Sequence, residues 1–224
     1  MEQYKLLFDV ITGTEPMGFD DLMSNLRIKV YLEPVEDIIL MDIGELQNDP
    51  NNEHSINHNT YTFYEMLSIG DINTVQSLFV DTQYAHDMHA CYYEMRKHRQ
   101  MFISQIYFNK ILEFLKYAIK IKKPIFDGQV AIPGVSTEED KTEFVQLAFN
   151  RKLLALSIGL NALLISQNQD VKHWSSIDPG IPELSFNSVD KKLRRCIKDL
   201  SNISEYKYGI NRTLLMEILR ADHV

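Results

Sequence analysis

The stretch Arg27-Ile28-Lys29-Val30-Tyr31-Leu32-Glu33 decides how the first part of the chain folds. Its apolar residues occupy every second position, which is the period of a β-strand with one buried face. The sequence therefore predicts a strand with a buried face of Ile28, Val30 and Leu32 and an opposite face of Arg27, Lys29 and Tyr31. Pro34 follows directly and ends the strand, because proline cannot donate a ladder hydrogen bond.

A second strand is predicted upstream of this stretch. The residues from Tyr4 to Thr12 are apolar and partly β-branched, and they end at Gly13, which is typical of a buried strand that runs into a tight turn. Residues 38–43 form a further short apolar run. Residues 47–59 are rich in Asn, Asp and His and are predicted to form a loop, because they contain too few apolar residues to bury a face.

Beyond residue 60 the apolar residues follow helical spacing. Helices are predicted over 101–121, 144–165, 189–203 and 211–220, with loops over 127–135 and 168–186. Ser136-Thr137-Glu138-Glu139 has the composition of a helix start with an acidic first turn. The expected fold class is α+β, with a small N-terminal α/β unit containing a mixed sheet over 1–60 and a helical unit packed on it over 61–224.

Composition restricts the setting in which the protein works. The 224 residues carry a formal net charge of −8, which opposes non-specific attraction to nucleic-acid phosphates. The two cysteines, Cys91 and Cys196, are far apart and form neither a disulfide framework nor a thiolate zinc motif. Because the chain shows no signal peptide and no uninterrupted membrane-spanning run, we expect a soluble cytoplasmic protein.

The turn between the two predicted strands carries a known signature. Gly13, Thr14, Gly18 and Ser24 are followed by Asn25 and Arg27 at the spacing of a glycine-serine turn that leads to a serine-aspartate-x-aspartate strand. The pattern resembles DNA polymerase β-type nucleotidyltransferases, and in particular the RNA-repair-associated branch that is common in bacteria and their phages. In this chain Asn25 and Arg27 stand where that family has its two metal-binding aspartates.

Two further stretches carry the same resemblance. Residues 63–79 are similar to a helix, a glycine-asparagine-proline-asparagine turn, a second helix and a closing leucine-phenylalanine pair, with Asp71-Ile72 in place of asparagine-proline. Residues 96–104 resemble the arginine, phenylalanine, leucine and serine segment that precedes a long helix in that family. Together the three stretches cover roughly the first 120 residues, and the C-terminal half matches only in being helical.

The resemblance implies a glycine turn that holds a triphosphate and acidic residues that hold two divalent metal ions. Replacing two aspartates by Asn25 and Arg27 changes the charge at these positions from −2 to +1. A guanidinium repels a divalent cation, so neither a bound metal nor another cofactor is expected. The residues expected to bind a nucleotide or phosphate instead are Gly13, Thr14, Ser24, Asn25, Arg27 and Lys29. The alternative interpretation of the two strand cations is a solvated, half-exposed strand face.

The alternative is an active enzyme in which other carboxylates of the signature region bind the metal ions, and Mg²⁺ is expected only in that case. The candidates for such relocated ligands are Asp20, Asp21, Glu33, Glu36, Asp37 and Asp42. His86 and His89, with Cys91 and His98 close behind, have partly zinc-like spacing but lack a well-placed fourth ligand, so surface histidines are the favoured interpretation.

Two basic clusters form a candidate nucleic-acid surface. Its members are Lys116, Lys120, Lys122, Lys123, Arg194 and Arg195, and aromatic residues are interleaved with the first group. Solvated helix faces are the favoured interpretation unless both clusters converge on one cleft. Trp174, in a predicted loop, is expected to be a packing anchor over the bundle.

Three functions follow from these observations. The first is a nucleotidyltransferase-like phage or bacterial protein that is catalytically degenerate and binds a nucleotide, RNA or a host protein. The second is an active metal-dependent nucleotidyltransferase that acts on RNA or protein through relocated carboxylates. The third is a regulatory protein-interaction module with no small-molecule ligand, which would show an exposed apolar patch instead of a cleft.

Overall fold

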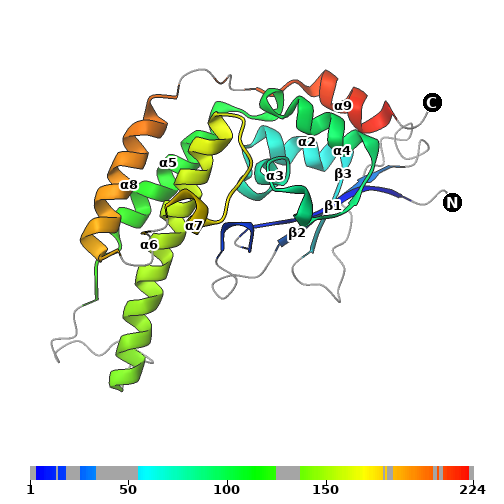
Figure 1. Ribbon diagram of the computed structural model, residues 1–224. Helices are drawn as coiled ribbons and strands as arrows, with labels where there is room; N and C mark the ends of the chain where they lie inside the picture. Colours follow the sequence, from blue (N-terminus) through cyan, green and yellow to red (C-terminus); the bar gives the residue numbers. More distant parts are fainter. Residues whose placement is uncertain are drawn as a thin grey trace.

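The computed structural model describes residues 4–13, 15–18, 26–33, 55–124, 137–178, 180, 184–203, 206 and 209–221. Its architecture is α+β, as predicted: a small mixed sheet is covered by helices and continues into a helical bundle (Figure 1). Among the described residues the strands are β1 (Lys5–Thr12), β2 (Leu26–Leu32), β3 (Ser55–Asn59) and β4 (Ala85–Met88), in the spatial order β3-β2-β1-β4.

The predicted strand pair is confirmed. β1 and β2 run antiparallel with Asp9 opposite Lys29, while β3 is parallel to β2 and β4 is antiparallel to β1. Phe8, on the helix-covered face, packs on Phe63 and Tyr92 at ring-centroid distances of 5.4 Å and 5.0 Å. The helices that cover this face are α2 (Thr60–Ser68), α3 (Ile72–Ser77) and α4 (Ala90–Lys97).

The alternation in β2 follows the prediction. Ile28 and Val30 are fully buried beneath the helices, and Arg27 and Lys29 lie on the opposite face at intermediate exposure. The helix-covered face supplies the apolar core of this part of the molecule, because side chains of a strand alternate between its two faces. We call the other side, which carries Asp9, Arg27, Lys29 and Asn57, the polar sheet face.

Two predictions missed a strand. The stretch predicted as a loop over 47–59 ends in strand β3, and the part of the chain beyond residue 60 contains strand β4. Neither strand has an alternating apolar pattern, so periodicity could not predict it. These short polar segments form strands because pairing with β2 and β1 satisfies their backbone hydrogen bonds. Residues 38–43 lie outside the described residues, and the division into units at residue 60 stays a prediction.

Gly70, in the turn between α2 and α3, lies where the sheet-covering helices contact the bundle. It adopts φ +65°, and a Cβ atom there would lie 2.5 Å from the backbone nitrogen of Tyr107. A side chain is therefore excluded both by the left-handed backbone and by the close approach of α5 (Gln105–Lys120). Asp71 follows as the N-cap of α3 and accepts from the Thr74 backbone N–H at 2.8 Å.

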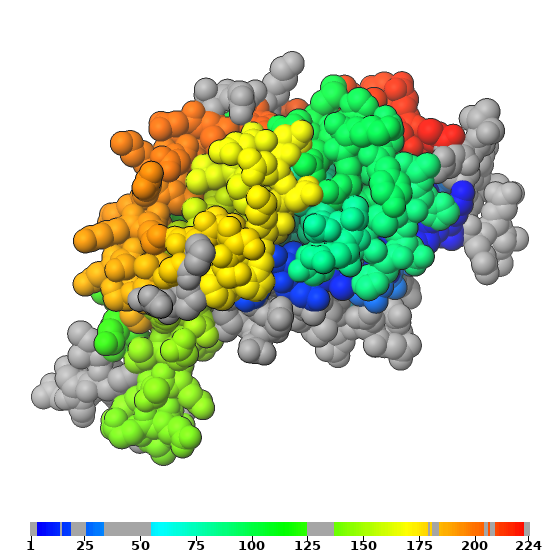
Figure 2. All heavy atoms as spheres, viewed as in Figure 1, coloured from blue at the N-terminus to red at the C-terminus, as the bar shows by residue number. Residues whose placement is uncertain are grey.

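The bundle consists of α5, α6 (Glu138–Ser166) and α8 (Phe186–Ser201), which pack together. α6 contains the predicted helix over 144–165 and begins at the predicted acidic start, where Thr137 and Asp140 form a capping box. The first half of α6 projects beyond the rest of the molecule (Figure 2). α6 is long and apolar enough to cross a membrane, yet 56% of its apolar window is buried inside the protein, as in a core helix.

The remaining short elements connect these layers. They are the 3-10 helices η1 (Glu15–Met17), η2 (Thr82–Tyr84) and η3 (Arg99–Phe102), and the helices α7 (Trp174–Ile177) and α9 (Arg212–Arg220). α7 lies within the stretch predicted as a loop. Glu33, at the end of β2, accepts from Thr60 at the start of α2 and pairs with Arg220 of α9 at 3.5 Å. This buried carboxylate attaches the C-terminal helix to the sheet.

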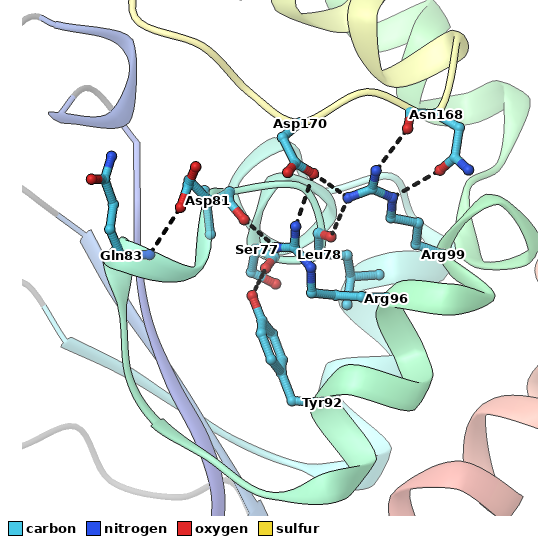
Figure 3. A network of polar contacts seen from close by, with 10 residues as sticks. Ser77, Leu78, Asp81, Gln83, Tyr92, Arg96, Arg99, Asn168 and Asp170 are labelled. Carbon is cyan, nitrogen blue, oxygen red and sulfur yellow. Dashed lines mark hydrogen bonds and ion pairs between the residues drawn. The ribbon is translucent and has the colours of Figure 1, made fainter.

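A charged network holds the end of α6 against the α/β layer (Figure 3). Arg99 donates to the side chain of Asn168 at 2.8 Å and to its carbonyl at 2.7 Å, and it also pairs with Asp170. Arg96 reaches the same Asp170 carboxylate at 2.9 Å. The Arg99 guanidinium also lies 4.4 Å from the Phe79 ring centroid. Segments about 70 residues apart in sequence are thus joined by two arginines.

Candidate phosphate-binding site on the sheet

The central feature of the polar sheet face is an ion pair between neighbouring strands. Arg27 donates to Asp9 through Nε at 3.1 Å and through Nη2 at 2.5 Å. The Asp9 side chain is 4% exposed and that of Arg27 is 32% exposed. Asp9 sits diagonally across from Arg27 in the β1–β2 ladder, within reach of a long side chain. The two-pronged contact fixes the guanidinium in one orientation.

Lys29 adds a second cation beside this pair. It lies directly opposite Asp9 on β1 and opposite Asn57 on β3, and it makes no ion pair with any described residue. Arg27 uses Nε and Nη2 for Asp9, so its Nη1 group has no partner in the described part of the chain. The face therefore offers one lysine ammonium and one free edge of a guanidinium, donors that suit an anionic oxygen.

The glycine turn lies at the Arg27 end of the two strands. Gly13 has φ +83°, and a Cβ atom there would lie 3.7 Å from Leu26 and 4.0 Å from the Asn73 side-chain oxygen. Thr12 donates to the Leu26 carbonyl at 3.3 Å and so helps to close the turn. The start of α3, which belongs to the second resembling stretch, is thus next to the first.

Residues from the far end of the chain hold the second glycine of the signature. Trp174 donates its indole N–H to the Gly18 carbonyl at 2.9 Å, and the His173 ring occupies the space that a Gly18 side chain would need. Figure 2 shows this yellow segment against the blue residues of the N-terminal strand region. Trp174 is partly buried against the core, and its hydrogen bond goes to the glycine loop, while its packing over the bundle stays a prediction.

The described residues of this face do not suit a two-metal centre. Arg27 places a permanent positive charge on this face, and it already engages the Asp9 carboxylate. Asp87 on β4 lies opposite Asp9, and Glu33 lies at the other end of β2, paired with Arg220. Within the described residues no group of three His, Cys, Asp or Glu side chains is placed to hold a metal ion. His86, His89 and His98 therefore do not form a zinc-like cluster with any described residue.

The structure brings together part of the predicted phosphate site. Gly13 lies at the end of the strand pair that carries Arg27 and Lys29, whereas Thr14, Ser24 and Asn25 lie outside the described residues. The relocated-carboxylate candidates Asp20, Asp21, Glu36, Asp37 and Asp42 also lie outside them. The sequence interpretation missed Asp9, which pairs with Arg27 from 18 residues upstream. Its signal was an acidic residue inside an otherwise apolar run, from Leu6 to Ile11.

The basic clusters divide into structural and exposed residues. Arg96 and Arg99 belong to the charged network and are not part of an open basic surface. The predicted nucleic-acid residues are exposed: Lys116, Lys120, Lys122, Lys123, Arg194 and Arg195. A cavity between α6 and α8 has Lys192 and Arg195 on its wall and no residue of α5. Convergence of the two clusters on one cleft therefore has no support in the described residues, and nucleic-acid binding there stays a prediction.

Comparison of the chain with models of protein families, with curated proteins and with solved structures found no match. The family relationship therefore remains the resemblance of the three sequence stretches.

Proposed function

We propose that the protein is nucleotidyltransferase-like and binds the phosphate of a nucleotide or of an RNA end on its polar sheet face, without two-metal chemistry. The observation that carries this proposal is the Arg27–Asp9 pair at the position where the resembling family places a metal-binding carboxylate. A guanidinium there favours an anion directly, whereas a carboxylate would favour it only through a bound cation.

The geometry supports direct phosphate binding in two ways. Asp9 holds the Arg27 side chain in place, so little of its conformational freedom is lost when a ligand arrives. Lys29 supplies a second positive charge beside Arg27 on this face, which also carries the carboxylates of Asp9 and, opposite it on β4, Asp87. In a chain whose overall charge is −8, these two neighbouring cations are the groups of this face that can contact an anion directly.

Equilibrium binding of the four nucleoside triphosphates and of a 5′-phosphorylated oligoribonucleotide tests the proposal. Because the contacts are made by protein cations, binding should persist in excess EDTA. Lys29→Gln should weaken binding by roughly tenfold or more, since a hydrogen bond to a charged group contributes about 1.5–3 kcal/mol. Lys110→Gln is the matched control, because it removes the same charge from an exposed lysine of α5. Equal binding by both variants would refute the proposal.

The same preparation distinguishes the alternative of an active enzyme. The protein is incubated with α-labelled nucleoside triphosphates, Mg²⁺, Mn²⁺ and mixed cellular RNA and protein. Label transfer that is lost on Gly13 substitution would establish an enzyme with relocated carboxylates and would overturn the metal-free proposal. If neither transfer nor nucleotide binding occurs in the folded protein, the interaction-module function becomes the leading hypothesis.

A further inference from the structure

A cavity of about 770 Å³ lies away from the polar sheet face. Its walls come from η3, from the end of α6 and from the segment that precedes α9. A cavity of this size matches the usual volume of small-molecule sites, which is about 300–1,000 Å³. It shares no residue with the polar sheet face and has no role in the function proposed above.

The polar groups of the cavity are oriented by bonds elsewhere. Asn168 accepts from Arg99 Nε through Oδ1 at 2.8 Å, and Asn211 accepts from the Leu214 backbone N–H through Oδ1 at 3.1 Å. Both partners are N–H donors, so each amide points its oxygen at its partner and its NH2 group away from that partner. Figure 3 shows the Asn168 amide nitrogen on the side away from Arg99.

Gln167 provides a third donor in the same way. Its Oε1 accepts from Gln169 at 3.3 Å, which leaves its NH2 group without an acceptor in the described part of the chain. The NH2 groups of Asn168 and Asn211 likewise have no acceptor among the residues described. The three amides thus present hydrogen-bond donors and no carboxylate or cation lines the cavity beside them.

The rest of the wall is mixed: Gln100, Ser166 and Tyr206 are polar and bond to other protein groups, and the remaining side chains are apolar. Met101 is 45% exposed and Ile103 is 3% exposed, and Ile210 completes this part of the lining. An exposed methionine at a cavity wall is a flexible apolar surface that adapts to a flat ring. Neutral donors beside apolar side chains match a planar, uncharged ring whose edge carries several acceptors.

We infer that this cavity binds a nucleobase, with its carbonyl and ring-nitrogen acceptors facing the amides of Gln167, Asn168 and Asn211 and its ring against Met101. Free nucleosides are the appropriate probes, because they lack the phosphate that the polar sheet face would bind. Binding of nucleosides and binding through Lys29 can therefore succeed or fail independently.

The first experiment titrates uridine, cytidine, adenosine and guanosine into protein labelled with ¹³C at the methionine methyl groups. The Met101 methyl signal, assigned with Met101→Leu, should shift on binding of at least one nucleoside. If no nucleoside shifts this signal, the inference is refuted.

Variants then test the donors. Gln167→Glu with Asn211→Asp removes two NH2 groups and keeps the oxygen that caps α9. Loss of two hydrogen bonds should weaken nucleoside binding about tenfold or more. The matched control is Gln83→Glu with Asn109→Asp, which changes the charge equally at exposed sites outside the cavity.

A filling variant gives an independent readout. A Cβ atom at Gly209 meets no atom within 4 Å, so Gly209→Phe should fold and occupy the cavity. Its nucleoside binding should be lost while its unfolding transition stays close to that of the natural protein. Binding that survives both the donor variant and the filling variant would overturn the inference.

Discussion

Replacing Arg27 by methionine removes the charge that accompanies a buried carboxylate while it keeps an unbranched side chain of similar reach. Asp9 is 4% exposed and accepts two hydrogen bonds from Arg27, at 3.1 Å and 2.5 Å. After the substitution Asp9 is left buried beside Lys29 alone. The variant should still form the sheet, because Ile28 and Val30 on the covered face are unchanged.

The expected loss of unfolding free energy follows from the difference in burial between Asp9 and Arg27. Removing one partner of a fully buried pair costs about 3–5 kcal/mol, because the other charge is left uncompensated. Arg27 is 32% exposed, so water reaches part of this site and the expected loss is about 2–4 kcal/mol. Asp9→Asn removes the buried charge itself and leaves a guanidinium that water can reach, so it should cost less. The double variant should be closer to the natural protein than Arg27→Met alone.

Urea unfolding followed by far-ultraviolet circular dichroism measures all four proteins of this cycle. A favourable coupling energy between the two sites is the expected result. A loss below about 1 kcal/mol in Arg27→Met would show that the buried carboxylate does not depend on this contact. A double variant that is less stable than both single variants would also refute the reasoning.

Three further outcomes are expected from other parts of the molecule. Gly159→Leu should lower the free energy of unfolding by about 3 kcal/mol, because a Cβ atom there lies 2.7 Å from Cys196 Sγ in a packed helix crossing. Asp190→Asn should destabilise the protein more than Lys152→Met, because Lys152 is 1% exposed and Asp190 is 30% exposed. Burial lowers the pKa of His58 below its ordinary value of 6.5, against an opposing effect of a nearby carboxylate. The unfolded chain therefore binds this proton more tightly, so the contribution to stability is full above pH 6.5 and is lost as the pH falls through the lowered pKa.

Each of these outcomes has its own control. Gly209→Leu adds the same side chain where a Cβ atom meets nothing within 4 Å, and it should leave the unfolding transition unchanged. If Lys152→Met lowers the free energy of unfolding more than Asp190→Asn does, the argument from the burial of Lys152 is wrong. Urea unfolding measured from pH 5 to pH 8 should show a flatter profile for His58→Phe; identical slopes would exclude His58 as the titrating group.

Local features of the sequence predicted much of the framework. The alternation around Ile28 and Val30 identified both faces of β2, and the acidic start at Thr137 located the beginning of α6. The turn at Gly70 was also identified correctly. Periodicity and capping depend on residues within one or two turns of each other, so neighbours in the chain are sufficient to indicate them.

The site residues were predicted less completely. Arg27 and Lys29 were placed correctly on one strand face, but the partner of Arg27 was not identified, because Asp9 lies on another strand. Arg96 and Arg99, in the third resembling stretch, had no predicted partner either. They are bound to Asp170, which approaches only when the end of α6 returns to the α/β layer.

The sequence by itself determined the α+β class and the strand that carries Arg27 and Lys29, and it places Asn25 and Arg27 where the resembling family would have carboxylates. These properties depend on composition and on short-range spacing. Only the tertiary structure decided that Asp9 occupies one side of Arg27 and that three amides line one cavity. Contacts between residues far apart in the chain depend on strand register and helix packing, and no local pattern in this sequence encodes either of them.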